Sequence, residues 1–164
     1  MKLVSLAFIA ILYCSSASAQ LKTTVKCPEI DVNLLKGIVN KTVLPTSDPA
    51  LINHDIPCAT AFNATSSSNK CGAGVFYKSK DIYFYTDRDY VEIGPAFKGR
   101  LSLPLMNASR SSLFKYLGAP QIRESNWEAY ETSYGILIIY FNKQNRVNKI
   151  QFSTKTAKNI QLCD

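Results

Sequence analysis

The sequence predicts a single α+β domain with an antiparallel sheet, stapled by disulfides. Three observations lead to this fold class. The C-terminal third has a helical pattern followed by three strand patterns, β-branched and aromatic residues concentrate after Gly74, and the cysteines beyond the first nineteen residues form an even set. Beyond those nineteen residues about 145 remain (164 minus 19), which is the size of one ordinary domain.

The first nineteen residues have the pattern of a secretory signal peptide. Lys2 precedes an apolar run over residues 3–13, and Ala17-Ser18-Ala19 places small residues where a signal peptidase cuts. The apolar run is too short to span a bilayer as a helix, which takes about 20 residues. We therefore expect an exported protein, secreted or periplasmic, with no transmembrane segment in its mature chain.

Cleavage after Ala19 sets the predicted domain boundaries: a signal peptide over residues 1–19 and one domain over residues 20–164. The alternative is lipid attachment at Cys14. This alternative is disfavoured because Tyr13 is bulky where a small residue is needed, and because the cut would fall inside the apolar run.

Four cysteines remain after cleavage, namely Cys27, Cys58, Cys71 and Cys163. In an oxidising compartment an even set predicts two disulfides, for which three connectivities exist. We prefer Cys58–Cys71, which would close the loop between them, together with Cys27–Cys163, which would tie the ends of the mature chain. No pair has the C-x-x-C spacing of a redox or zinc site, so we expect no metal and no cofactor.

The charge balance favours anionic partners. The mature chain has 18 basic residues (19 minus Lys2) against 12 acidic ones, a net charge of about +6. Acidic proteins, phospholipid headgroups, polysaccharides and nucleic acid all fit this charge, although export argues against nucleic acid. The other interpretation is that the lysines only keep the protein soluble. Asn40, Asn63 and Asn107 begin N-x-S/T triplets, which would matter only in a eukaryotic source.

Residues 20–75 look irregular and are rich in proline. Asp31 is placed to cap a short helix over residues 32–39, because the apolar residues of that stretch fall on one side at helical spacing. The polar stretch over residues 60–69 predicts an exposed loop between two cysteines.

The middle of the chain has β character. Strands are predicted at residues 75–77 and 82–86, which are dense in β-branched and aromatic residues, and residues 90–93 are predicted to continue the second strand past Asp87-Arg88-Asp89. Residues 78–81 predict a hairpin turn between the first two strands. Alternating leucines over residues 101–105 predict an extended segment, and the proline among them places it at a sheet edge.

The C-terminal third has the clearest pattern. Ser109 predicts the start of a helix that runs to Leu117, and Gly118 with Pro120 ends it. Three antiparallel strands are predicted next, at residues 127–132, 136–141 and 147–153. The middle strand is apolar almost throughout, which indicates a central strand covered on both faces. Residues 156–162 predict a final short helix.

One resemblance rests on three motifs of this region. Leu113-Phe114-Lys115-Tyr116-Leu117-Gly118-Ala119-Pro120 is followed by Tyr134-Gly135-Ile136 and then by Arg146-Val147-Asn148-Lys149-Ile150. The series resembles the repeat of the β-lactamase-inhibitor-like fold, which small outer-membrane-assembly lipoproteins share. It covers about 45 of 164 residues and implies a helix, a leucine-glycine-x-proline turn and a meander. No inhibitor loop matches, so no site residue carries over, and a fold alone does not transfer a function.

The candidate binding residues are Tyr83, Tyr85, Tyr90 and Lys149. Period two along a strand puts Tyr83 and Tyr85 on one face and Phe84 on the other. If Phe84 is in the core, the tyrosines form an exposed platform suited to a protein or glycan partner. Lys149 belongs to a basic patch around the C-terminal meander. The competing interpretation is that both faces are covered and the tyrosines only pack.

Candidate catalytic groups are few. His54 is the only histidine, and no nucleophile motif accompanies it. Asp87 and Asp89 would share a strand face, as a glycosidase pair requires, but no partner carboxylate is evident and a salt-bridging strand end fits better. We therefore expect no enzyme.

The predicted function is an exported binding or inhibitor-like protein that recognises a protein or an envelope component through a sheet face. The alternatives are an extracytoplasmic hydrolase of unrecognised type and a basic protein that associates with an anionic membrane surface.

Overall fold

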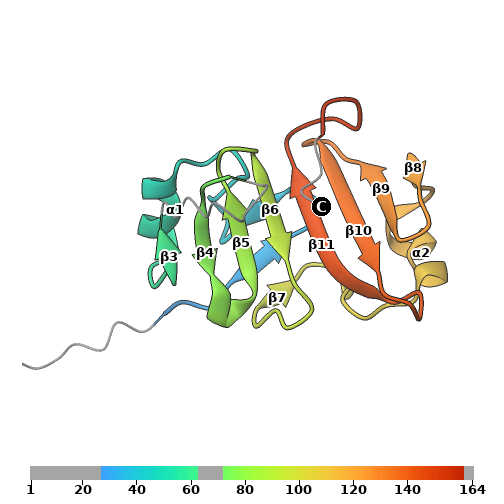
Figure 1. Ribbon diagram of the computed structural model, residues 1–164, viewed down its shortest axis with the longest axis horizontal. Coiled ribbons are helices and arrows are strands. Elements are labelled where there is room, and N and C mark those ends of the chain that lie inside the picture. The colour runs from blue at the N-terminus through green and yellow to red at the C-terminus, as the bar shows by residue number, and fades with distance from the viewer. Residues whose placement is uncertain (1–26, 63–71, 161–164) are drawn as a thin grey trace, which may run out of the picture.

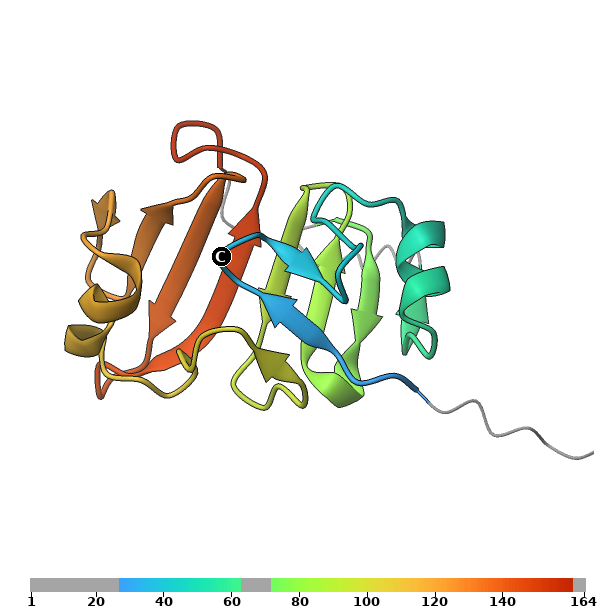
Figure 2. The ribbon, with the colours of Figure 1, turned by 180° about the vertical axis from the view of Figure 1, so that it is seen from behind.

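The computed structural model describes residues 27–62 and 72–160, and these residues form two β-sheets. The larger sheet is antiparallel, and its strands lie in the order β3 (Ala61–Phe62), β4 (Val75–Tyr77), β5 (Ile82–Tyr85), β6 (Tyr90–Ile93), β11 (Val147–Ser153), β10 (Ile136–Phe141), β9 (Trp127–Glu131) and β8 (Ile122–Arg123) (Figure 1). The smaller sheet has the order β2 (Ile38–Val39), β1 (Asp31–Asn33) and β7 (Arg100–Leu101), and it lies against the back of the larger one (Figure 2).

The predicted α+β class is wrong, because the described chain is mostly β. Its α-helices are α1 (Pro49–Asp55) and α2 (Phe114–Leu117), and its 3-10 segments are η1 (Lys78–Lys80) and η2 (Arg110–Ser112). Each is one or two turns long, which is too short to form a helical layer over a sheet. The small sheet and the loops take the place of that layer.

The large sheet is built from two similar halves. Strands β3 to β6 form one four-stranded meander, the first half-sheet, and β8 to β11 form another, the second half-sheet. Helix α1 precedes the first, and η2 with α2 precedes the second. The halves meet along their last strands, where β6 pairs with β11 and Val91 lies opposite Phe152. The outer edges of the large sheet are therefore the two-residue strands β3 and β8.

The main core lies between the back of the large sheet and the small sheet. Phe84, Val91 and Phe152 point into it from three strands of the large sheet, and each is at most 1% exposed. Val32 and Leu34 close it from the small-sheet side. Burial of one such side chain stabilises the fold by about 1.5–3 kcal/mol relative to exposure. The same cluster reaches both half-sheets, so the two halves share one core.

The helix predicted over residues 32–39 is wrong, because this stretch is the β1–β2 hairpin. Val32 pairs with Val39, and Gly37 makes the turn at a φ of +63°. The apolar spacing fits a helix and a hairpin equally well, and pairing with β7 favours the strand. Asp31 does not cap a helix, because its carboxylate binds Arg100 on β7.

The helix predicted from Ser109 to Leu117 is also wrong. The chain forms the single turn of η2 and then the single turn of α2, and the Ser109 side chain caps neither. The predicted strands after it are present as β9, β10 and β11, and every residue of β10 is buried, as expected of a central strand. Residues 156–160 form a turn in place of the predicted final helix, whose remaining residues lie outside the described chain.

The predicted disulfide pairing is wrong as well. Cys27 binds Cys58, with a Cα–Cα distance of 5.7 Å. The chain leaves Cys27, forms the β1–β2 hairpin and returns through α1, which brings the two cysteines together. A hydrogen bond of 2.5 Å from the Thr42 hydroxyl to the Asp55 carboxylate links the residues after β2 to the end of α1. The bond excludes the predicted pairs with Cys71 and Cys163, and both of those residues lie outside the described chain.

Candidate functional site

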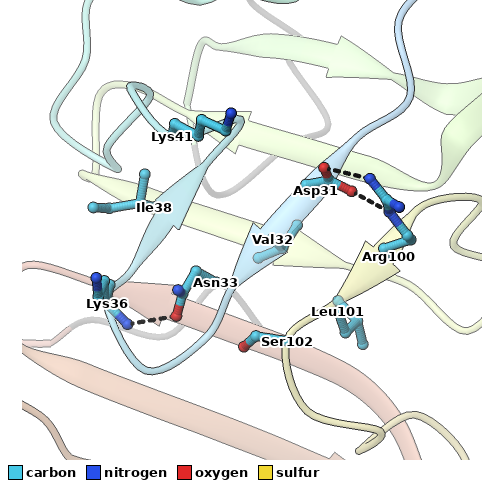
Figure 3. Close-up of a pocket in the computed structure, with 9 residues that line it drawn as sticks. All are labelled: Asp31, Val32, Asn33, Lys36, Ile38, Lys41, Arg100, Leu101 and Ser102. Atoms are coloured by element: carbon cyan, nitrogen blue, oxygen red, sulfur yellow. Dashed lines mark hydrogen bonds and ion pairs between the residues drawn. The ribbon is translucent and has the colours of Figure 1, made fainter.

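A groove on the small sheet combines apolar and charged side chains and is the candidate site. Its volume is about 410 Å³, and all three strands of the small sheet line it (Figure 3). The lining residues are Asp31, Val32, Asn33, Lys36, Ile38, Lys41, Arg100, Leu101 and Ser102. The groove therefore lies on the segment that covers the back of the first half-sheet, away from the face on which the predicted tyrosines lie.

The groove has an apolar floor and a hydrogen-bonded frame. Ile38 and Leu101 are half-buried and supply apolar surface. The Asn33 side chain accepts the backbone N–H of Lys36 at 3.1 Å and so fixes the hairpin turn. Ser102 accepts the backbone N–H of Leu34 at 3.0 Å and ties the strand after β7 to the hairpin. The two walls of the groove are thus held at a set spacing before any ligand binds.

Arg100 is fixed in place by Asp31. Its Nε and Nη2 atoms donate to the two carboxylate oxygens at 2.7 and 2.8 Å, which is the bidentate geometry that arginine prefers. This hydrogen bonding holds the pKa of the Asp31 carboxyl below its usual value and raises the pKa of Arg100. The pair is exposed, so it orients Arg100 more than it stabilises the fold.

Two lysines give the groove its surplus charge. Lys36 and Lys41 stand on either side of Ile38 and are both exposed, across the groove from the Asp31–Arg100 pair (Figure 3). Neither forms an ion pair with any described residue. Three cations against one carboxylate leave a net charge of +2 among the lining residues. The arrangement can therefore bind anionic groups above an apolar floor.

The predicted binding tyrosines lie on the front face of the large sheet. Tyr83, Tyr85 and Tyr90 pack together with Phe76, and the Phe76–Tyr85 ring centroids are 5.3 Å apart. Tyr85 and Tyr90 are only 9% and 2% exposed, and Tyr83 is half-buried. Burial and a hydrogen bond to Asp81 raise the pKa of Tyr83 to about 12. This is a packed aromatic cluster, with less exposed surface than the predicted platform needs.

Lys149 lies on the same front face but on β11. Its Nζ atom is 4.1 Å from the centre of the Tyr140 ring and 3.8 Å from a carboxylate oxygen of Glu92. The structure thus gathers the three predicted tyrosines and places Lys149 beside a different aromatic ring. None of the four lines the groove.

The predicted catalytic candidates occupy two different places. His54 is on α1, with its side chain 84% exposed and its Nδ1 atom 2.8 Å from Asp55. Asp87 and Asp89 lie in the turn between β5 and β6, where Asp87 accepts the backbone N–H of Ala73 and Asp89 pairs with Lys155 at 2.7 Å. Asp87 borders a small cavity of about 240 Å³, whose lining includes neither of the other two.

Within residues 27–62 and 72–160, no three His, Cys, Asp or Glu side chains are placed to share an ion.

Sequence reasoning missed the groove. Its residues come from two segments about 60 positions apart, and neither segment has a functional motif. Lys36 lies within the stretch that was predicted as a helix over residues 32–39, and Lys41 lies just beyond it, so neither lysine was connected with a groove.

The comparisons with known proteins add no information about function, so the candidate site is described from its geometry alone. Across the described part of the chain, no helix has the length and apolar character needed to cross a membrane. A scan against protein-family models and searches of the curated proteins and the solved structures found no match to this chain.

Proposed function

We propose that this protein is an exported, non-enzymatic binding protein that holds an acidic segment of a partner protein in the groove of the small sheet. The observation that carries the proposal is the pair Lys36 and Lys41, which stand exposed across the groove from Arg100 and form no ion pair with any described residue. Export is the expectation from the N-terminal sequence, and recognition through a sheet face is retained from the sequence prediction.

Charge selects the class of partner. The lining residues carry a net charge of +2 and the whole chain carries +7, so an acidic segment is attracted at long range and again on contact. The Asp31 carboxylate is already engaged by Arg100, so it repels an incoming carboxylate less than a free one would. The lysine side chains are long enough to reach acidic residues of different spacing.

The shape of the groove favours a protein segment over a membrane surface. A lipid bilayer presents a flat array of headgroups, whereas this site is concave and has an apolar floor of Ile38 and Leu101. An acidic segment with one or two apolar residues satisfies both features, because its carboxylates meet the lysines while its apolar side chains cover the floor.

The test is a binding titration with the oxidised protein. A fluorescent oligoglutamate peptide that contains one leucine should bind saturably, and added salt should weaken it. The double variant Lys36→Gln/Lys41→Gln should weaken binding roughly tenfold, because it removes two exposed charge contacts. The matched control is Lys78→Gln/Lys158→Gln, which removes the same charge from exposed positions outside the groove and should bind like the parent.

Two results would overturn the proposal. One is an equal loss of affinity in both double variants, because the attraction would then depend on net charge alone. The other is preferential binding to vesicles that contain phosphatidylserine, or to an anionic polysaccharide, with no saturable binding of the peptide. Either of those ligands would point to a surface-associated protein.

A further inference from the structure

A second polar cavity lies at the far edge of the second half-sheet. It has a volume of about 580 Å³ and lies between η2, the edge strand β8, the strand β9 and the β10–β11 turn. The lining residues are Ser109, Arg110, Ser111, Arg123, Glu128, Gln144 and Asn145. Backbone bonds hold its walls together, since Arg110 N–H donates to the Asn145 carbonyl at 2.9 Å and Ser109 bridges to Arg146.

A buried carboxylate organises this cavity. Glu128 is 2% exposed, and its Oε1 atom lies 3.0 Å from Nε of Arg110 and 2.9 Å from Nε of Arg123. Its Oε2 atom accepts the Tyr130 hydroxyl at 2.6 Å. A buried carboxylate requires compensation of this kind, because an unpaired buried charge costs several kcal/mol.

The two arginines differ in how much of their hydrogen-bonding capacity is used. Arg110 also donates from Nη1 to the Ser125 carbonyl and from Nη2 to the Glu124 carbonyl, and its guanidinium lies 4.7 Å from the centre of the Phe141 ring. Each of the three guanidinium nitrogens of Arg110 therefore donates a hydrogen bond, and the side chain is partly buried. Arg123 is 68% exposed, and its two Nη groups have no partner in the described part of the chain.

Arg123 is thus a surplus cation that is paired with Glu128 through Nε alone. Arg110 alone neutralises Glu128, so adding Arg123 leaves the cluster with a net charge of +1. The ion pair through Nε restrains the guanidinium and leaves four N–H groups of Nη1 and Nη2 for an outside acceptor. The hydroxyls of Ser109 and Ser111, which hydrogen-bond to each other at 3.3 Å, also line the cavity.

We propose that this cavity binds an oxyanion, namely a phosphate or sulfate ester group, with Arg123 as its principal ligand and Glu128 as the residue that positions Arg123. A planar arginine fork matches the oxygens of such a group, and a bidentate contact of this kind is among the strongest hydrogen-bonded pairs. The side-chain amides of Gln144 and Asn145 suit hydroxyl groups on the carrier of the ester. The cavity is separate from the groove on the small sheet, so the two sites are tested independently.

The experiment is a titration of the full oxidised protein, followed by amide chemical shifts, with inorganic phosphate, inorganic sulfate and glucose 6-phosphate in parallel. Saturable shifts confined to residues around the cavity are expected, and the arm that binds most tightly identifies phosphate, sulfate or a sugar ester as the preferred form. Arg123→Gln and Arg123→Lys should each lose roughly tenfold or more in affinity, since lysine keeps the charge but lacks the fork. Arg123 is exposed on an edge strand, so both variants should keep the thermal midpoint of the parent.

The matched control is Lys143→Gln, an exposed cation in the adjacent turn that does not line the cavity. It should bind phosphate like the parent, as should Lys36→Gln/Lys41→Gln. The proposal is overturned if Arg123→Lys keeps the parent affinity, if Lys143→Gln loses as much as Arg123→Gln, or if none of the three ligands gives saturable shifts.

Discussion

The two half-sheets have the same strand order but are covered in different ways. The back of the first half-sheet is covered by a three-stranded sheet and α1, which the Cys27–Cys58 bond ties together. At the far edge of the second, η2 is held to β9 through the buried Glu128 and Arg110. The front faces differ too, since the first has an aromatic cluster and the second a cluster centred on Ile136 and Ile138.

This difference shows where the candidate sites arise. Both the groove and the oxyanion cavity involve covering segments, where the two halves diverge, and neither lies on the front of the sheet. In the groove the charged side chains come from the small sheet and its hairpin loops, whereas in the second cavity Arg110 comes from η2 and Arg123 and Glu128 come from β8 and β9. The two halves therefore differ in what stabilises them, and that difference can be measured.

The largest effect is expected at the buried ion pair of the second half-sheet. Glu128→Ala leaves the partly buried Arg110 without its carboxylate, and breaking such a pair typically costs about 3–5 kcal/mol in the free energy of unfolding. The comparison is Glu92→Ala in the first half-sheet, where the carboxylate is half-buried and accepts from Gln151 at 2.6 Å. That loss should be about 1 kcal/mol. Chemical denaturation measures both, and equal losses would show that the two carboxylates have the same structural role.

The Cys27–Cys58 disulfide should contribute nearly as much to the free energy of unfolding. Cys27→Ser/Cys58→Ser opens a crosslink between positions 31 apart, and restoring chain entropy to the unfolded state should cost about 3–4 kcal/mol. Chemical denaturation of the double variant measures the loss. Peptide mapping of the unreduced parent checks the pairing, and a map that joined Cys58 to Cys71 or Cys27 to Cys163 would contradict it.

Gly37 tests how the cover of the first half-sheet is joined to the second. Gly37 has a φ of +63°, and an added Cβ would lie 2.6 Å from the ring of Tyr134, whose hydroxyl donates to the Leu34 carbonyl. Gly37→Ala should cost about 2–3 kcal/mol, because it adds a clash to an unfavourable backbone angle. Gly118→Ala is the control, since Gly118 has a φ of +72° but open space around it. Its cost should be about 1 kcal/mol. Thermal unfolding compares the two, and similar losses would mean that Tyr134 moves aside.

The smallest effect is expected in an alkaline titration, where both half-sheets contain tyrosines with a raised pKa and burial raises the pKa of Tyr130 and Tyr134 in the second half-sheet further than in the first. Burial raises the pKa of Tyr77 and of Tyr83 in the first half-sheet to about 12, from the ordinary 10.0. A raised tyrosine pKa stabilises the folded state fully below pH 10, and this contribution is lost as the pH rises from 10 through 12. Tyrosinate absorbance should therefore show a late phase near pH 12. Tyr77→Phe and Tyr83→Phe should each reduce that phase, and an unchanged phase in both would contradict the assignment.

The strands were more predictable than their covers. The segments around Phe84, Val91, Ile138 and Ile150 have side chains whose apolar, aromatic or β-branched character already matches burial on a sheet, so their pattern survives in the fold. The stretch from Val32 to Val39 was predicted wrongly because its apolar spacing suits a helix and a hairpin equally. Its pairing with β7 depends on residues far along the chain.

Helix α1 shows a signal that was present and missed. Asp48 accepts two backbone N–H groups at its start, and Pro49 occupies the first helical position, a combination that marks a helix start. At Ser109 a helix start was predicted that is not there. Serine is a favourable capping residue, but the segment after it forms two separate single turns, η2 and α2. The groove was beyond prediction, since Asp31 and Arg100 meet only after the small sheet has formed.

The pairing of β6 with β11 has a consequence for the order in which the chain is made. A ribosome completes β6 well before β11, because the whole second half-sheet is translated between them. Until then β6 presents an unpaired edge, and partial chains with such an edge tend to associate with one another. In the described part of the folded chain, β6 pairs with β11 and the large sheet ends in the two-residue strands β3 and β8. The chain should therefore be most prone to self-association before β11 has been made and paired with β6.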